Sequence, residues 1–266
     1  MTVDAKKPRV ALVVHGVQLG ADSDQNQHLD IAALINNRRG SIPLNFKTDI
    51  YRYEDINDRA IGPIKSLIKL IAKTPLAGKL AESSMELIGD VVLNLQDGST
   101  AQKVRDGLKK KILHYYEQGN PCYLVAHSLG SIYALDVVNE LIRDEALFER
   151  DRRTTWPVQG LLTIGSPIGL SMFRKGRTSL SKLGPGSKLL RWKNCWDRND
   201  PVVSGNVFGK TINGFDIAEK YQKEDESQGW FIKDVPVNTG KLWMMAHTAY
   251  WDLPEVGDIL VDMMAN

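Results

Sequence analysis

The sequence has few cysteines, almost no net charge and no long apolar run. Its two cysteines, Cys122 and Cys195, form neither a disulfide framework nor a metal-binding spacing. The net charge of the 266 residues is +2, so overall charge does not indicate a nucleic acid partner. No apolar run reaches the roughly 18 residues that a membrane-spanning helix needs. These absences predict a protein that works in a reduced, cytoplasmic setting and binds no nucleic acid.

The composition is that of an ordinary globular protein, with 42% hydrophobic and 25% charged residues. A chain of this length can bury most of its apolar surface in one large core. Short apolar runs alternate with segments of helical periodicity along the chain. We therefore expect a single domain over residues 1–266.

Continuous apolar runs such as "RVALVVHG", which a glycine ends, are typical of strands buried on both faces of a sheet. Because parallel neighbours need a crossover, strands that alternate with helices predict a mainly parallel sheet in a three-layer, doubly wound α/β fold. Ligands of such folds bind outside the carboxyl ends of the strands. The expected strands are 9–16, 46–54, 121–126, 158–167 and 188–196, with a sixth at 230–237 or near Leu242. The expected helices are 24–38, 98–120, the segment from the Ser128 turn to 143, and 254–264.

The stretch "CYLVAHSLGSIYALDVV", from Cys122 to Val138, joins an apolar strand to a helix through Ser128. A sharp turn at this point pushes the serine side chain out over the edge of the sheet. The small residues Ala126 and Gly130, two positions away on each side, avoid clashes in such a strained turn. The unpaired N–H groups at the start of the helix would stabilise an oxyanion beside the serine. Ser128 is thus a candidate nucleophile, and the alternative is an ordinary N-cap in a strand–helix loop.

Candidate partners for Ser128 follow later strands. Asp200 lies in "WDRNDPVVS" at the end of the fifth expected strand, and His247 lies in "MMAHTAYWD" after an apolar stretch. In one group of serine hydrolases with this chain order, the histidine takes the serine proton and the aspartate holds the imidazole in its productive tautomer. Taken alone, the histidine could be a core residue and the aspartate a turn cap. Asp197 is the alternative acid, although a position in or beside the strand should turn its side chain in another direction.

The segment "VVHGVQ" ends the first expected strand with His15 and Gly16. An N–H group from this position could join one from the helix after Ser128 in an oxyanion hole. We assign the two donors to the backbones of Val17 and Leu129. Because His15 precedes the serine in a glycine turn, a structural role is favoured for its side chain. The arrangement needs no cofactor and no metal.

These pieces resemble the α/β-hydrolases of the serine esterase and lipase type, in particular the bacterial lipase-like and GPI-inositol-deacylase-like group. The matching stretches are "VVHGV", "LVAHSLGSIYALDVV", "LLTIGSPIGL", "WDRNDPVV" and "HTAYW", which spread from residue 13 to residue 251. Two features depart from the family pattern. Ala126 replaces the first glycine of Gly-x-Ser-x-Gly, and the interval of 47 residues from Asp200 to His247 is longer than usual. The long interval predicts an insertion that contains "EKYQKEDESQGW".

The resemblance implies an α/β-hydrolase fold and a serine hydrolase that cleaves a carboxylic ester through an acyl-enzyme. Its substrate would be a small-molecule or lipid ester. Acyl transfer and thioester or amide hydrolysis use the same residues and remain alternatives, as does a catalytically silent member of the fold that binds a partner. The sheet order of the family also places the strand that leads to Gly165 between those of Cys122 and Cys195. The two thiols should therefore be unable to form a disulfide.

We expect two segments, 58–95 and 166–187, to be insertions that cover the site as lids. The run from Arg59 to Ala81 and the run from Ser166 to Trp196 contain cations and no acidic residue. These cations could form solvated faces, or a basic lid that recruits an anionic substrate or an anionic membrane surface. The basic residues are Arg59, Lys65, Lys69, Lys73, Lys79, Arg174, Lys175, Arg177, Lys182, Lys188, Arg191 and Lys193. The glycines and serines of "KGRTSLSKLGPGS" predict that the second segment is mobile.

Overall fold

The computed structural model describes residues 1–16, 26–52, 99–144, 146–149, 152–174, 190–205, 214–221 and 231–266. Six strands in this part of the chain form one sheet. They are β1 (Arg9–Val14), β2 (Phe46–Tyr51), β3 (Cys122–His127), β4 (Val158–Ile164), β5 (Arg191–Asp197) and β6 (Phe231–Val237). The strand order is β2-β1-β3-β4-β5-β6, and every pairing is parallel. The expectation of a parallel sheet is confirmed, and the sixth strand is the first of its two predicted positions.

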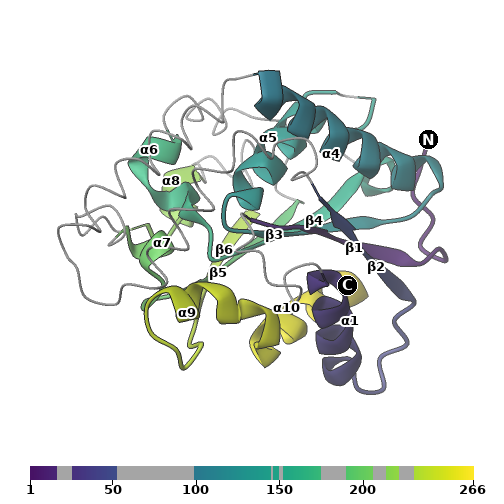
Figure 1. Ribbon diagram of the computed structural model, residues 1–266. Coiled ribbons are helices and arrows are strands. Elements are labelled where there is room, and N and C mark those ends of the chain that lie inside the picture. Colours follow the sequence, from purple (N-terminus) through teal and green to yellow (C-terminus); the bar gives the residue numbers. More distant parts are fainter. Residues whose placement is uncertain are drawn as a thin grey trace.

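Helices cover both faces of the sheet (Figure 1). One face carries α4 (Ser99–Glu117) and α5 (Gly130–Ile142), and the other carries α1 (Gln27–Arg38) and α10 (Pro254–Ala265). Since parallel neighbours are joined by crossovers, both faces of such a sheet become buried. The shorter elements are η2 (Arg153–Thr155), η3 (Pro167–Gly169), α6 (Ser171–Arg174), α7 (Pro201–Ser204), α8 (Ala218–Tyr221), α9 (Met244–Thr248) and η7 (Ala249–Asp252). The described residues therefore form the three layers of a doubly wound α/β fold.

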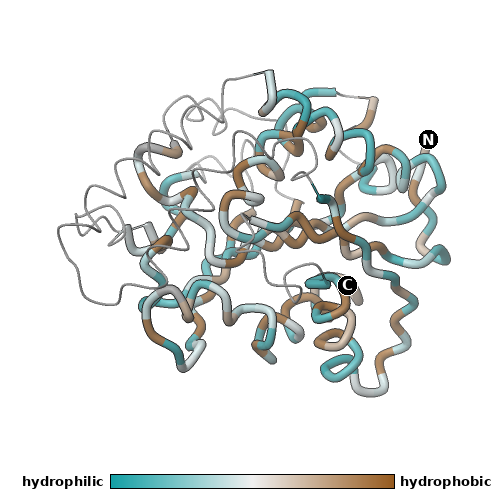
Figure 2. The backbone as a smooth tube through the Cα atoms, in the orientation of Figure 1, coloured by the Kyte–Doolittle hydropathy of each residue, from teal (hydrophilic) through white to brown (hydrophobic). Residues whose placement is uncertain are grey.

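Alternate side chains of the strands enter two separate cores. In β1, Val10, Leu12 and Val14 pack on the side of α4 and α5, whereas Ala11 and Val13 pack on the side of α1 and α10. All residues of β3 are buried, which explains why its sequence is almost continuously apolar and does not alternate. Figure 2 shows these apolar strands crossing the centre of the molecule.

The direction in which strands are added reverses between β1 and β3. From β1 the chain moves through α1 to β2 at one edge, and from β3 it moves through β4 and β5 to β6 at the other. β1 and β3 are neighbours, so their carboxyl ends flank the reversal point, where ligands of doubly wound folds bind. Gly16 and Ser128 follow closely after these two strand ends. The topology therefore directs attention to the same serine as the sequence.

The two cysteines lie on strands that do not touch. Cys122 begins β3 and Cys195 lies in β5, with β4 between them. Both thiols are free and buried, and burial raises the pKa of each to about 12. The predicted separation is confirmed, and neither thiol forms a reactive thiolate at neutral pH.

The two predicted lid segments are described only in small part. The segment 58–95 lies outside the described residues, and the segment 166–187 is described as far as residue 174. The described start of the second segment packs into the core, because Ile168, Leu170 and Phe173 are buried together with residues of α5. Burial of these apolar side chains in the core is lower in free energy than their exposure to solvent above the sheet.

Two residues of the second basic run also lie within the sheet. Arg191 and Lys193 belong to β5, where each is partly buried.

Among the described helices, none combines the length and the apolar character that crossing a bilayer requires.

Candidate active site

Ser128 occupies a strained turn between β3 and α5. Its φ angle of 52° lies in the left-handed region, which costs a residue with a side chain about 1–3 kcal/mol. The backbone N–H of Ser128 donates to the carbonyl oxygen of Ile164, at the end of the neighbouring strand β4, over 3.2 Å. Ala126, two residues earlier, is fully buried in the core on the side of α5. The sharp strand-to-helix turn that the sequence predicts is therefore present.

Two glycines make room for this turn. A Cβ atom at Gly130 would lie 2.2 Å from the backbone oxygen of His15 and 2.4 Å from that of Val14. A Cβ atom at Gly16 would lie 2.5 Å from the Cβ of Ser128. The need for a small residue at position 130 is confirmed, and the chain after β1 passes directly against the serine.

Replacing Gly130 with alanine is expected to destabilise the fold by about 1–3 kcal/mol, because the clashing atoms belong to the backbone and cannot turn away. Helix propensity alone predicts the opposite sign, a gain of up to about 1 kcal/mol, since Gly130 begins α5. Urea unfolding of the two proteins distinguishes these signs. A variant more stable than the parent would contradict the close packing of α5 against the end of β1.

His247 connects Ser128 to Asp200. Its Nε2 atom lies 3.0 Å from the Oγ of Ser128, and its Nδ1 atom lies 2.9 Å from Oδ2 and 3.1 Å from Oδ1 of Asp200. A carboxylate only accepts, so the proton of the neutral ring is on Nδ1, and Nε2 can accept a hydrogen bond from the serine hydroxyl. The histidine is 119 residues from the serine and 47 from the aspartate along the chain. The structure brings all three side chains together beyond the carboxyl ends of the strands.

The long interval between Asp200 and His247 has a structural explanation. It contains α8 and the whole of β6, which adds a strand to the sheet before the chain returns to the site. The stretch 219–230, predicted to lie within an insertion, is described only as far as Tyr221, the last residue of α8.

Asp200 is fully buried and is held by several donors besides the imidazole. It caps α7, where its Oδ1 accepts from the backbone N–H groups of Val202 at 2.9 Å and Val203 at 3.4 Å. The hydroxyl of Tyr250 donates to Oδ2 over 2.9 Å. These bonds satisfy a carboxylate that burial alone would destabilise, and they set the plane in which it faces His247.

Tyr250 is a residue of this site that sequence reasoning missed. Besides donating to Asp200, its hydroxyl accepts from the backbone N–H of Asp197 over 2.8 Å. Burial, and then the charge of Asp200, raises the pKa of Tyr250 well above its usual value, so the hydroxyl keeps its proton and remains a donor. A signal was present in "HTAYW", because a residue three positions after His247 returns to the same side of a helical turn.

Gly165, which follows β4, allows these groups to lie close together. Its φ angle is 55°, and a Cβ atom there would lie 2.8 Å from Cε2 of Tyr250 and 3.1 Å from Nδ1 of His247. A side chain at this position would therefore push the imidazole away from its carboxylate.

The alternative acid, Asp197, points elsewhere. Its Oδ2 accepts from the backbone N–H and the hydroxyl of Thr239, each over 2.6 Å, and its Oδ1 accepts from the backbone N–H of Asn199 over 2.8 Å. Asp197 therefore anchors the loop that follows β6. The structure brings Asp200, and not Asp197, to the imidazole of His247.

Of the two predicted oxyanion donors, Leu129 is described and Val17 lies outside the described residues. Leu129 directly precedes α5, where the first N–H groups have no acceptor within the helix. The ring of His15 is buried, and its Nδ1 donates to the carbonyl oxygen of Gly16 over 2.5 Å. The contact agrees with the structural role predicted for His15.

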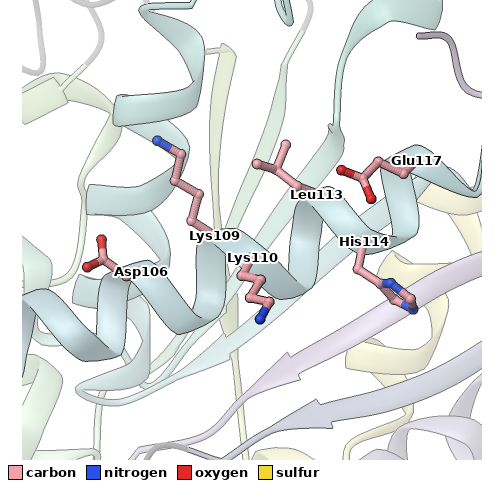
Figure 3. A pocket seen from close by; sticks show the side chains of 6 residues that line it. All are labelled: Asp106, Lys109, Lys110, Leu113, His114 and Glu117. Atoms are coloured by element: carbon pink, nitrogen blue, oxygen red, sulfur yellow. The ribbon is translucent and has the colours of Figure 1, made fainter.

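A pocket on the surface of α4 does not belong to the serine site (Figure 3). α4 leads to the beginning of β3, whereas Ser128 follows the end of that strand. The pocket has a volume of about 380 Å³ and is lined by Asp106, Lys109, Lys110, Leu113, His114 and Glu117.

The part of the chain that the structure describes contains no group of His, Cys, Asp and Glu side chains that could hold a metal ion.

No family model matches the sequence, and no curated protein matches it. A hydroxyl, an imidazole and a buried carboxylate in one chain of hydrogen bonds can transfer a proton from the serine as it attacks an electrophile.

Proposed function

We propose that the protein is a serine hydrolase of the α/β-hydrolase fold that cleaves a carboxylic ester through an acyl-enzyme intermediate. The observation that carries the proposal is the chain of hydrogen bonds from Ser128 through His247 to Asp200. Two further features support it: the strained turn at Ser128 precedes a helix, and it follows a strand beside the reversal point of the sheet.

In acylation, the Oγ of Ser128 attacks the ester carbonyl carbon while its proton passes to Nε2 of His247. The backbone N–H groups of Leu129 and Val17 stabilise the charge on the former carbonyl oxygen. His247 then gives the proton to the leaving alcohol, and the acyl group remains on Ser128. Water attacks this acyl-enzyme, His247 again transfers the proton, and the carboxylic acid and free serine are released. Asp200 stays ionised and stabilises the imidazolium that forms in each step.

The proposed substrate class follows from two runs of the sequence, 59–81 and 166–196, which contain cations and no acidic residue. Cations in the segments 58–95 and 166–187 favour an anionic or lipid-like ester, presented in solution or at a membrane surface, with these segments as lids. A cytoplasmic location belongs to the same proposal and is supported by the two free cysteines.

A fluorophosphonate probe tests the mechanism, because it reacts with an activated serine and not with an ordinary hydroxyl. We expect the folded protein to gain one probe at Ser128, located by mass spectrometry of its peptides, and the urea-unfolded protein to gain none. Ser128→Ala should abolish labelling, whereas Ser41→Ala, at an exposed position, should leave it unchanged. Labelling that persists in Ser128→Ala, or a folded parent that stays unlabelled, would contradict the proposal.

Activity assays on the same protein preparations test the substrate class. Neutral and anionic p-nitrophenyl esters of graded chain length, with thioester and amide analogues, separate ester hydrolysis from its chemical relatives. Faster turnover of anionic esters is expected. Equal rates on neutral and anionic esters would contradict the role given to the basic segments.

A further inference from the structure

A second histidine lies directly against the proposed base. His127 is the last residue of β3, immediately before Ser128, and only 6% of it is exposed. Its Nε2 atom lies 2.8 Å from the backbone carbonyl oxygen of His247. Because a carbonyl oxygen only accepts, Nε2 of His127 carries a proton and donates it to this bond.

The rings of the two histidines also pack together. Their centroids are 4.6 Å apart with an angle of 33° between the ring planes. Trp251 meets the ring of His127 edge-on, with the centroids 5.1 Å apart, and the ring of Tyr250 lies 6.3 Å away. His127 therefore occupies one side of the base and is itself enclosed by the residues that follow His247.

His127 stays neutral, and in this state its Nε2 atom can serve as a fixed hydrogen-bond donor. Burial, reinforced by repulsion from the protonated forms of His247 and, to a smaller extent, of His15, lowers the pKa of His127 to about 3. The bond to the carbonyl oxygen and the carboxylate of Asp200 act in the opposite direction and are outweighed. The ring stays neutral at the pH values where esterases work, so it does not compete with His247 for the serine proton.

The element that carries His247 needs such support. α9 has five residues, and a helix of this length is not stable by itself. It starts after Trp243, whose φ angle is 58°, and Leu242 and Met245 are largely exposed. Asp200 holds the imidazole only through Nδ1, so this contact leaves the position of the backbone open.

We propose that His127 is a positioning residue, which holds the backbone of His247 and thereby keeps its Nε2 atom within reach of the Ser128 hydroxyl. This inference rests on the proposed function. One strand end then supplies both the nucleophile and the contact that locates its base. The distance between them is consequently set by the last residue of a fully buried strand and the residue that follows it, and not by a five-residue helix alone.

Three substitutions separate the effect of the hydrogen bond from the effect of the packed ring. His127→Gln keeps a donor, because the amide nitrogen of glutamine is the same number of bonds from the backbone as the imidazole Nε2. His127→Asn carries the same amide one bond closer to the backbone and cannot span the 2.8 Å contact. His127→Phe keeps a ring and removes the donor. His114→Gln, at an exposed position of α4, is the matched control.

The experiment measures three quantities for each protein: the free energy of unfolding in urea, the rate constant of fluorophosphonate labelling, and the downfield proton resonance of Nδ1–H in His247. Among folded proteins, His127→Asn and His127→Phe should label about 10- to 100-fold more slowly than the parent, since a shift of about 1 Å between reacting groups has effects of this size. With p-nitrophenyl butyrate this loss should appear in kcat with KM little changed. His127→Gln should label within about threefold of the parent, as should His114→Gln, if a donor at this position is what matters.

The resonance of His247 is the readout that a merely structural role would not change. It should broaden through faster exchange in His127→Asn and His127→Phe and stay sharp in His127→Gln. Folded His127→Asn with parental labelling and a sharp resonance would overturn the inference. If the parent itself is not labelled, the hydrolase proposal fails, and the resonance alone still decides whether His127 positions His247.

Discussion

Replacing Asp200 with asparagine is expected to lower ester hydrolysis about 10⁴-fold while the protein remains folded. With its side-chain oxygen in the place of Oδ1, asparagine can still accept from Val202, so the capping of α7 is kept, whereas the bond that Tyr250 donates to Oδ2 is lost. The amide nitrogen, however, then faces Nδ1 of His247 and donates to it. The imidazole is driven to the other tautomer, in which Nε2 carries a proton and cannot take one from Ser128.

The matched control is Asp197→Asn, three residues earlier at the end of the same strand. Its carboxylate bonds to Thr239 and Asn199 and makes no contact with the imidazole, so hydrolysis should stay within about tenfold of the parent. Steady-state rates on p-nitrophenyl butyrate and the rate of fluorophosphonate labelling provide the measurements. If Asp197→Asn lost activity as severely as Asp200→Asn, the assignment of the acid would be wrong.

Acid is expected to remove up to about 4–5 kcal/mol of stability through His127 alone as the pH falls from 6.5 to about 3. The folded protein keeps this ring neutral until about pH 3, whereas the unfolded chain takes up a proton below pH 6.5. The unfolded state therefore binds more protons in this interval, and stability falls as pH falls. Above pH 6.5 both states are neutral at this position, and the penalty is absent.

His127→Gln tests the acid effect, because glutamine keeps the buried donor and does not titrate. Urea unfolding at intervals between pH 4 and pH 8 should show a shallower loss of stability in the variant, by close to one bound proton per molecule in the acid range. The parent and the variant should respond alike above pH 7. Parallel curves throughout would show that His127 does not resist protonation in the folded protein.

The fold could largely be predicted because its signals are local. Strands such as β3 are buried on both faces, so nearly every side chain in them is apolar, and a run of this kind is visible without knowledge of its neighbours. The helices α4, α5 and α10 follow from their periodicity in the same way. Whether the segment 166–187 covers the site is not a local property of the sequence and stays a prediction, although Ile168 and Phe173 at its start are buried in the core.

The candidate site, like the fold, could be predicted only where its signals are local. The serine turn could be recognised from neighbouring residues, since small side chains beside Ser128 are a local requirement that Gly130 meets against the end of β1. His127 gave no comparable signal, and the spacing of Tyr250 from His247 indicated only that the two residues share one side of a helical turn. Each is an ordinary residue of its own element, and its importance comes from a partner elsewhere in the chain, Asp200 for the tyrosine and the backbone of His247 for the histidine.

Neighbouring residues alone indicate the alternation of strands and helices, the strand-to-helix turn at Ser128 and a short set of acids and histidines that could serve it. Asp197 and Asp200, three residues apart and chemically identical, are distinguished only in the folded chain, where Asp200 caps a helix beside the imidazole and Asp197 binds a loop. The tertiary structure also decides which residues surround His247. Periodicity and composition act over a few residues, whereas contacts across 47 or 119 residues exist only once parallel strands have aligned their carboxyl ends.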